Sequence, residues 1–158
     1  MAIQLKSTRD AAVAQGIKIL VHGPAGAGKT KQCATAPGKP IIISPGAGLL
    51  SLRDVDIPVI EVASIADVHE AYSFLCSEEG QAYDWVCIDS ISEIAEVVLN
   101  TEKKNTKDPR QAYGALAEQM TDLVRAFRDL PGRNVYMSCK QERVKDEATG
   151  ALLYGPSA

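Results

Sequence analysis

The sequence has little of several features that mark particular classes of function. Among its 158 residues there are only two histidines, His22 and His69, which lie too far apart to suggest a metal site. The four cysteines form no CxxC pair and sit mostly in apolar segments, which favours buried thiols over zinc ligands or disulfides. No apolar run approaches the roughly 20 residues needed to span a bilayer, so we expect no membrane partner.

An excess of charge of one sign is also lacking. The formal net charge of -3 at pH 7 argues against a protein that coats nucleic acid with its whole surface, but it permits a local basic patch. Residues 1–6 have neither the charged start nor the apolar stretch of a secretory signal. We therefore expect a cytoplasmic protein.

What the sequence does contain is a series of short apolar runs that alternate with amphipathic stretches. The runs are typical of buried strands, which we expect at 17–22, 41–44, 58–62, 85–89 and 135–139. Helices are predicted to begin near Lys29 and at the caps Ser64, Ser90 and Asp108. This alternation predicts an α/β fold with a mainly parallel central sheet, in a single domain over 1–158.

The end of the chain shows no last helix or edge strand. After a polar stretch there is one short apolar run at 151–154, and residues 142–158 are predicted to be a loop or partly disordered. We therefore expect a domain that lacks the C-terminal elements that would seal its core.

A glycine-rich segment follows the first predicted strand and opens a helix. Its spacing is G-x-x-x-x-G-K-[ST], in which small residues let consecutive backbone N–H groups turn toward an anion. Lys29 is expected to reach the β- and γ-phosphates of ATP, and the Thr30 hydroxyl to coordinate Mg²⁺. The strand-to-helix context disfavours a chance match in a Gly/Ala-rich loop. The predicted phosphate loop consists of Gly23, Pro24, Ala25, Gly26, Ala27, Gly28, Lys29 and Thr30.

An acidic residue, Asp89, ends the fourth predicted strand. In proteins with a phosphate loop, a carboxylate at this place holds Mg²⁺ or its water, so Asp89 is the second expected metal ligand beside Thr30. The alternative is a turn or capping aspartate, which is common after strands. Ser90 is interpreted as the cap of the next helix.

Segments outside these nucleotide motifs give the chain a resemblance to a known family. The segments 48–54, 88–94, 108–114 and 140–143 resemble those of bacteriophage RecA-like ATPases, small P-loop proteins linked to single-strand annealing and homologous recombination. The resemblance runs over most of the chain, from about 17 to 156. It implies a RecA-like three-layer core in the cytoplasm of a host cell, ATP between protomers, and single-stranded DNA bound by loops beyond the central strands. A second copy of the chain and a single-strand-binding protein are further candidate partners.

The resemblance also assigns a role to Gln141, which follows the predicted strand 135–139. It matches the glutamine that senses the γ-phosphate and couples it to the DNA-facing loop. With Lys29 it makes up the expected catalytic residues. A solvated amide at a strand end is the alternative.

One departure from the family concerns catalysis. RecA-like proteins carry a glutamate that activates water after the strand equivalent to 41–43, but Gly46 stands where we expect it. A general base must reach its water within hydrogen-bond distance, and no side chain here can do so. Glu93 and Glu61 are candidates to substitute, although nothing in the sequence demands either. Nucleotide binding is therefore a firmer expectation than fast turnover.

Two clusters of cations are candidate contacts to DNA phosphates. The first lies in and just after a loop that follows the predicted helix beyond Asp89, and consists of Lys103, Lys104, Lys107 and Arg110. The second follows the last predicted strand and consists of Lys140, Arg143 and Lys145. Each cation could neutralise one backbone phosphate without sequence preference. Interleaved acids leave a solvated surface as the alternative, and only the resemblance favours DNA.

Three functions fit the sequence. The first is an ATPase that acts with single-stranded DNA in recombination or annealing. The second is a nucleotide-gated assembly or scaffolding module with little hydrolysis, which the glycine at position 46 keeps open. The third, a small-molecule kinase, is disfavoured because its arginine-rich lid is lacking: the late basic segment 140–145 is short and partly acidic.

Overall fold

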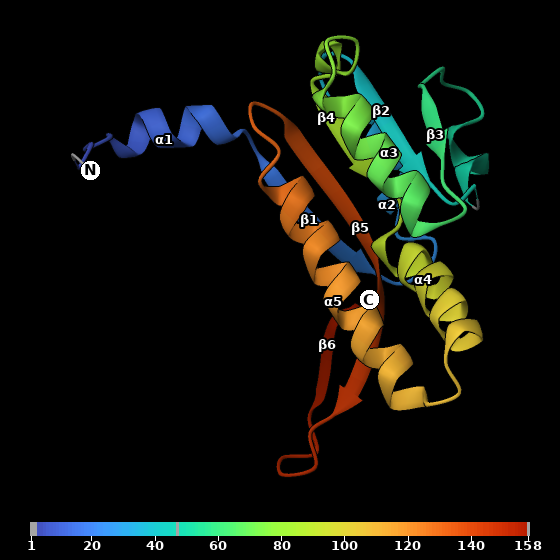
Figure 1. Ribbon diagram of the computed structural model, residues 1–158. Helices are drawn as coiled ribbons and strands as arrows, with labels where there is room; N and C mark the ends of the chain where they lie inside the picture. Colours follow the sequence, from blue (N-terminus) through green and yellow to red (C-terminus); the bar gives the residue numbers. More distant parts are fainter. Residues whose placement is uncertain (1–2, 47, 158) are drawn as a thin grey trace.

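The computed structural model describes residues 3–46 and 48–157, and its centre is a six-stranded sheet (Figure 1). Five strands run parallel in the order β1-β5-β4-β2-β3, and β6 pairs antiparallel with β5. The strands are β1 (Lys18–Gly23), β2 (Pro40–Ser44), β3 (Val59–Glu61), β4 (Trp85–Ile88), β5 (Asn134–Lys145) and β6 (Leu152–Ser157). The predicted α/β fold with a mainly parallel sheet is confirmed.

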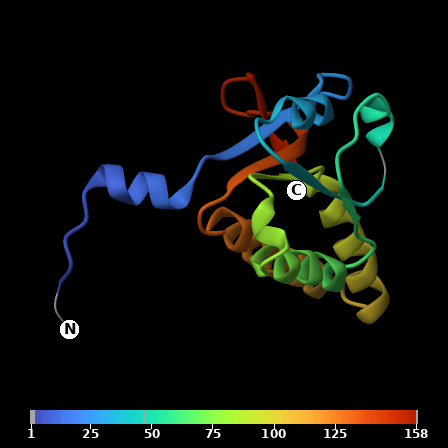
Figure 2. The same cartoon turned by 90° about the horizontal axis from the view of Figure 1, so that it is seen from above.

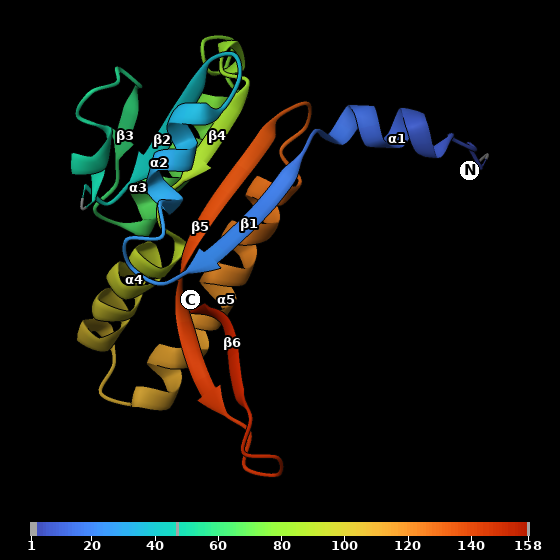
Figure 3. The same cartoon turned by 180° about the vertical axis from the view of Figure 1, so that it is seen from behind.

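Helices lie on both faces of the sheet, which gives three layers when the molecule is seen from above (Figure 2). One face carries α3 (Ile65–Cys76), α4 (Ile91–Asn105) and α5 (Pro109–Arg128). The short α2 (Lys29–Gln32) lies on the opposite face, in front of the sheet in Figure 3. The 3₁₀ turns are η1 (Cys33–Thr35), η2 (Leu49–Leu52) and η3 (Gly80–Ala82). The N-terminal α1 (Thr8–Gln15) extends away from these layers.

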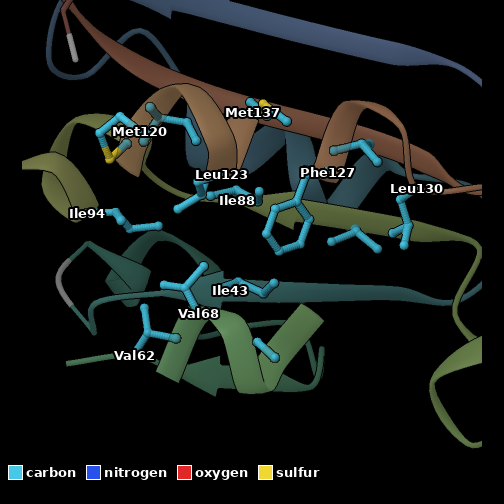
Figure 4. Packing of buried hydrophobic residues seen from close by; sticks show 14 of the residues in the cluster. Ile43, Val62, Val68, Ile88, Ile94, Met120, Leu123, Phe127, Leu130 and Met137 are labelled. Carbon is cyan, nitrogen blue, oxygen red and sulfur yellow. The ribbon is translucent and has the colours of Figure 1, made fainter. Parts of the chain in front are cut away.

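The larger part of the core lies between the sheet and the layer of α3, α4 and α5. Because side chains alternate along a strand, Ile41 and Ile43 of β2 both point into it. Ile88 of β4 and Phe127 of α5 are buried in the same cluster (Figure 4). Tyr72 meets the Phe127 ring edge to face, with 5.4 Å between the ring centroids. This packing fixes where α4 starts, directly beyond the end of β4.

A smaller apolar cluster lies on the other face of the sheet. It joins Ile42, Cys87 and Tyr136, one from each of three neighbouring strands, to Cys33 of η1. All four side chains are buried. This cluster holds α2 and η1 against the sheet, and thus positions the segment that follows the glycine-rich loop.

Three helix starts follow the predicted caps. Ser64 and Ser90 each accept a hydrogen bond from the backbone N–H three residues later, at 3.2 Å. Asp108 accepts one from Arg110 N at 2.9 Å, with proline at the first helical position. These bonds satisfy N–H groups that have no partner within the helix, and they set the residue at which each helix begins.

The chain beyond residue 142 forms regular structure where we predicted a loop or partly disordered tail. β5 continues to Lys145, and β6 returns beside it with Leu152 opposite Lys145. In the turn between them, Asp146 accepts hydrogen bonds from Ala148 N at 2.9 Å and from a threonine hydroxyl at 2.6 Å. Backbone pairing across the turn outweighs the polarity of the segment, so the expected absence of a last strand was wrong. Residue 158 lies outside the described residues.

A buried arginine ties the start of β5 to the end of α3. Arg133 Nη1 donates to Gly80 O at 2.8 Å and to Tyr83 O at 3.2 Å, and its Nη2 donates to Leu75 O at 2.8 Å. One guanidinium therefore satisfies three carbonyls in the connection between α3 and β4.

Replacing Arg133 with Met should lower the free energy of unfolding by about 3 kcal/mol, because three carbonyl groups lose a charged donor. Urea denaturation measures this change. The control is Arg128→Met, which breaks an exposed ion pair with Asp129 and should leave the free energy of unfolding nearly unchanged. Equal losses in the two variants would contradict the structural role of Arg133.

Candidate functional site

A pocket of about 670 Å³ opens at the carboxyl ends of β1 and β4, beside the middle of β5. Open parallel sheets place their ligands at this edge. Its walls come from the glycine-rich loop, α2, η2, the start of α4 and the middle of β5. The lining residues are Gly23, Pro24, Ala25, Gly26, Gly28, Lys29, Thr30, Lys31, Gly48, Ser51, Asp89, Ser90, Glu93, Lys140 and Gln141. Of the predicted phosphate loop, Ala27 is the residue that does not line the pocket.

The loop between β1 and α2 takes a shape that needs glycine. Gly26 and Gly28 have φ angles of 80° and 86°, in the left-handed region that other residues rarely adopt. Gly28 is also the residue that precedes α2. The helix that we predicted to begin near Lys29 does so, but it is short, because α2 ends at Gln32 and the 3₁₀ turn η1 follows. Because α2 is so short, its helix dipole is weak. We therefore expect the backbone N–H groups of the loop and the Lys29 ammonium to attract the anion.

The Lys29 ammonium folds over the loop at the pocket wall. Its Nζ donates to Gly23 O at 2.7 Å and to Pro24 O at 2.8 Å. Both carbonyls belong to the loop itself, so the ammonium is held beside the loop backbone. A flexible lysine stem can exchange these carbonyls for a stronger, charged acceptor in the pocket.

The two predicted metal ligands are in direct contact. Thr30 Oγ1 donates a hydrogen bond of 2.6 Å to Asp89 Oδ2, although the residues come from α2 and from the turn after β4. The other carboxylate oxygen of Asp89 accepts a hydrogen bond from Ser138 of β5. Asp89 is 6% exposed, and these two hydroxyl groups compensate for part of the cost of its burial.

Gln141 and Lys140 form the β5 wall of the pocket. Gln141 lies within β5 rather than after it, since the strand continues to Lys145. Lys140 stands opposite Gly23 in the pairing of β5 with β1, so the wall and the phosphate loop start side by side. The Lys140 Nζ makes an exposed ion pair of 2.6 Å with Glu96 of α4.

Several residues that support the site escaped the sequence analysis. The hydroxyl of Tyr136 lies 2.8 Å from Lys29 O and 2.9 Å from Gln32 Oε1, which ties β5 to α2. Burial raises the pKa of Tyr136, so its hydroxyl stays protonated and able to donate. Ser92 of α4 accepts from Lys140 N at 2.8 Å. Ser138 and Tyr136 are polar residues within an otherwise apolar strand. Because buried polar groups need hydrogen-bond partners, that pattern could have indicated that both residues contact the site.

Among the described residues, the carboxylates that line the pocket are Asp89 and Glu93. Among the described residues of the segment between β2 and β3, those that line the pocket are Gly48 and Ser51. Glu61 of β3 borders a separate hollow beside α3. Glu93 does line the pocket, and burial raises its pKa, with the Lys140 charge opposing and the Asp89 and Glu96 charges adding to the rise. Of the two sequence candidates for a water-activating glutamate, the structure brings only Glu93 to the pocket.

Apart from Lys140, the cations of the two predicted DNA-contacting clusters lie outside the pocket lining. Lys103 and Lys104 belong to the last turn of α4, not to a loop, and Lys103 Nζ lies 5.5 Å from the centre of the Tyr113 ring. Lys107 falls between α4 and α5, and Arg110 in the first turn of α5. The other cluster is on the hairpin of β5 and β6, with Arg143 and Lys145 in β5. The connection between α4 and α5 and the β5–β6 hairpin both extend past the carboxyl ends of β1 and β4 (Figure 1), on opposite sides of the sheet (Figure 2).

A fold and pocket of this kind define a P-loop nucleotide-binding domain, and comparison with known families agrees. The family model described as AAA domain matches residues 15–154. The chain therefore belongs to the AAA domain family of nucleotide-binding ATPase domains. A search of curated proteins finds no match.

No helix in 3–46 and 48–157 is long and apolar enough to cross a membrane. In the same ranges, no group of three or more histidine, cysteine or acidic side chains is arranged to hold a metal ion. A metal site made by the protein alone is therefore not found there, whereas a site completed by phosphate oxygens needs fewer protein ligands.

Replacing Tyr136 with Phe should weaken ATP binding about five-fold, because α2 loses a hydrogen bond worth about 1 kcal/mol that holds Lys29 and its neighbours in place. Titration with a fluorescent ATP analogue measures the affinity. Tyr154→Phe, on exposed β6 and outside the pocket lining, is the matched control and should bind as the parent does. Equal affinities in all three proteins would show that this hydrogen bond does not shape the site.

Proposed function

We propose that the protein binds and hydrolyses ATP with Mg²⁺, and that it acts with single-stranded DNA in recombination or annealing, as a RecA-like protein of phage origin would. The observation that carries the proposal is one pocket into which the glycine-rich loop, Lys29 and the Thr30–Asp89 pair converge. Membership of the AAA domain family supports the nucleotide part. The DNA part rests on the sequence resemblance and on the charge of the β5–β6 hairpin.

The pocket suits a triphosphate in charge and shape. Three lysines line it, Lys29, Lys31 and Lys140, against two carboxylates, Asp89 and Glu93. No atom lies within 4 Å of the place where a side chain would begin at Gly26 or at Gly28, so phosphate oxygens can approach the backbone closely there. Lys29 then binds the β- and γ-phosphates as a point charge.

The Thr30–Asp89 pair fits Mg²⁺. Both groups offer oxygen, the ligand atom that Mg²⁺ prefers, and both face the phosphate pocket. Mg²⁺ bound there would neutralise charge that develops on the phosphate oxygens. Thr30 would then turn its lone pair rather than its proton toward the site, and Ser138 would keep the Asp89 carboxylate oriented.

The β5–β6 hairpin supports a contact with single-stranded DNA. Side chains two apart on a strand share a face, so Arg143 and Lys145 project on the same side as Gln141. Tyr154 stands directly opposite Arg143 in β6 and is 54% exposed. Cations beside an exposed ring match the needs of a backbone phosphate and a stacked base. Gln141 would link this face to the nucleotide, since it also lines the pocket.

A second candidate function is a nucleotide-gated assembly module with little hydrolysis. The observation in its favour is that the segment from β2 to β3 brings no carboxylate to the pocket among the described residues. In that case a second copy of the chain or a single-strand-binding protein would be the partner that ATP controls. The structure adds no support for a small-molecule kinase, which we expect to have an arginine-rich lid. Among the described residues that line the pocket, none is arginine.

Replacing Lys29 with Ala should weaken binding of Mg-ATP at least about 100-fold, since the phosphates lose charge-assisted hydrogen bonds worth about 3 kcal/mol. Isothermal titration calorimetry measures the dissociation constant, and phosphate release measures turnover. Lys39→Ala removes an exposed lysine that does not line the pocket, and should change neither quantity. Unchanged affinity in the Lys29 variant would refute the assignment of the phosphate loop.

For DNA, we expect the double variant Arg143→Gln, Lys145→Gln to bind a single-stranded oligonucleotide with weaker salt dependence. Each lost phosphate contact should reduce the slope of log affinity against log salt by about 0.7. The triple variant Lys103→Gln, Lys104→Gln, Lys107→Gln tests the other cluster in the same way. An unaltered slope excludes the cluster concerned, and unaltered slopes in both variants contradict the DNA proposal.

A further inference from the structure

Two carboxylates are found among the residues that line the nucleotide pocket, Asp89 and Glu93. Both oxygens of the Asp89 carboxylate already have hydrogen-bond donors, because they accept from Thr30 and from Ser138. Across the described ranges 3–46 and 48–157, no hydrogen bond or ion pair engages the Glu93 carboxylate. Glu93 is thus the carboxylate in the pocket that is available to a ligand.

The position of Glu93 is fixed by the start of α4. Its backbone N–H donates to Ser90 Oγ at 3.2 Å, so it is the third residue of the helix. Ile91 and Ile94 are buried at 1% and 2% in the core beneath, which sets the rotation of the helix. With these two residues in the core, the opposite face of α4 points toward the pocket. Glu93 lies on that face, about one helical turn beyond Asp89.

The surroundings of Glu93 favour proton acceptance. Its side chain is half-buried, and burial is the largest cause that raises its pKa, so it is a stronger base than an exposed glutamate. The nearby Lys140 opposes this rise, but its ammonium is paired with Glu96 at 2.6 Å. The Asp89 charge on the other side raises the pKa further.

We propose that Glu93 is the general base of ATP hydrolysis, in place of the glutamate that the chain lacks at Gly46. This inference rests on the proposed hydrolysis of ATP. A water molecule between Glu93 and the γ-phosphate loses a proton to the carboxylate as its oxygen forms a bond to the γ-phosphorus. The bond from that phosphorus to the bridging oxygen breaks, and ADP leaves with the electron pair. Glu93 then releases the proton to solvent, so the products are ADP, phosphate and one proton.

The test is steady-state phosphate release by Glu93→Gln, with Mg-ATP affinity measured on the same protein. Gln keeps the size of the side chain but cannot accept the proton, so kcat should fall about 100-fold or more. The dissociation constant for Mg-ATP should stay within about two-fold of the parent value, which also shows that the variant is folded. Glu93→Asp, with a shorter carboxylate, should retain part of the rate.

The control is Glu118→Gln on α5, which replaces an exposed glutamate in the same way. Glu118 does not line the pocket, so the variant should hydrolyse ATP within about two-fold of the parent rate. A pH profile separates chemistry from structure. The parent rate should fall with decreasing pH through a pKa above 4.5, the ordinary value for glutamate, because a protonated carboxyl cannot act as the base. The residual rate of the Glu93→Gln variant should not show this fall with decreasing pH.

Three outcomes would overturn the inference. An active parent with an equally active Glu93→Gln variant removes the base role and leaves the proposed ATPase standing. A variant that loses Mg-ATP affinity instead of rate makes Glu93 a binding residue. A parent that binds ATP but releases no phosphate, with or without single-stranded DNA, refutes the proposed hydrolysis itself and this role with it.

Discussion

A hydrogen bond between two side chains 59 positions apart holds the site together. Thr30 sits at the start of α2, Asp89 at the end of β4, and their contact joins the glycine-rich loop to the centre of the sheet. Asp89 can be buried because hydroxyl groups on two neighbouring elements solvate its oxygens. The loop, the sheet and the first turn of α4 are therefore mutually positioned before any ligand enters, which reduces the entropy that binding must cost.

The apolar layers serve this arrangement from both sides. Beneath the sheet, the cluster around Phe127 fixes α4, and through it the side chains that point into the pocket. Above the sheet, Cys33 and Tyr136 hold the short α2 in place, where its own length could not stabilise a helix. Tyr136 adds a directional contact to the backbone of Lys29. Apolar packing thus sets the distances between α2, α4 and the sheet, and hydrogen bonds set the orientation of the side chains in the pocket.

How far the sequence predicts this molecule depends on how local each signal is. The strand positions, the caps at Ser64 and Ser90 and the glycine-rich loop follow from periods and spacings within a few residues, and the structure agrees with them. The hairpin after residue 142 was missed because pairing between strands depends on a partner segment, not on local polarity. Ser138 and Tyr136 were missed as site residues for the same reason: their partners lie about 50 and 105 positions away.

The length of β5 gives the pocket a mechanical connection to the molecular surface. One unbroken strand passes from the core at Val135 through the pocket wall at Gln141 to the hairpin turn. Lys145 lies four positions beyond Gln141, about 13 Å of extended chain, and β6 pairs along that span. Such a ribbon bends far less readily than a loop. A tilt of β5 at the pocket wall would therefore displace the tip of the hairpin further than the wall itself.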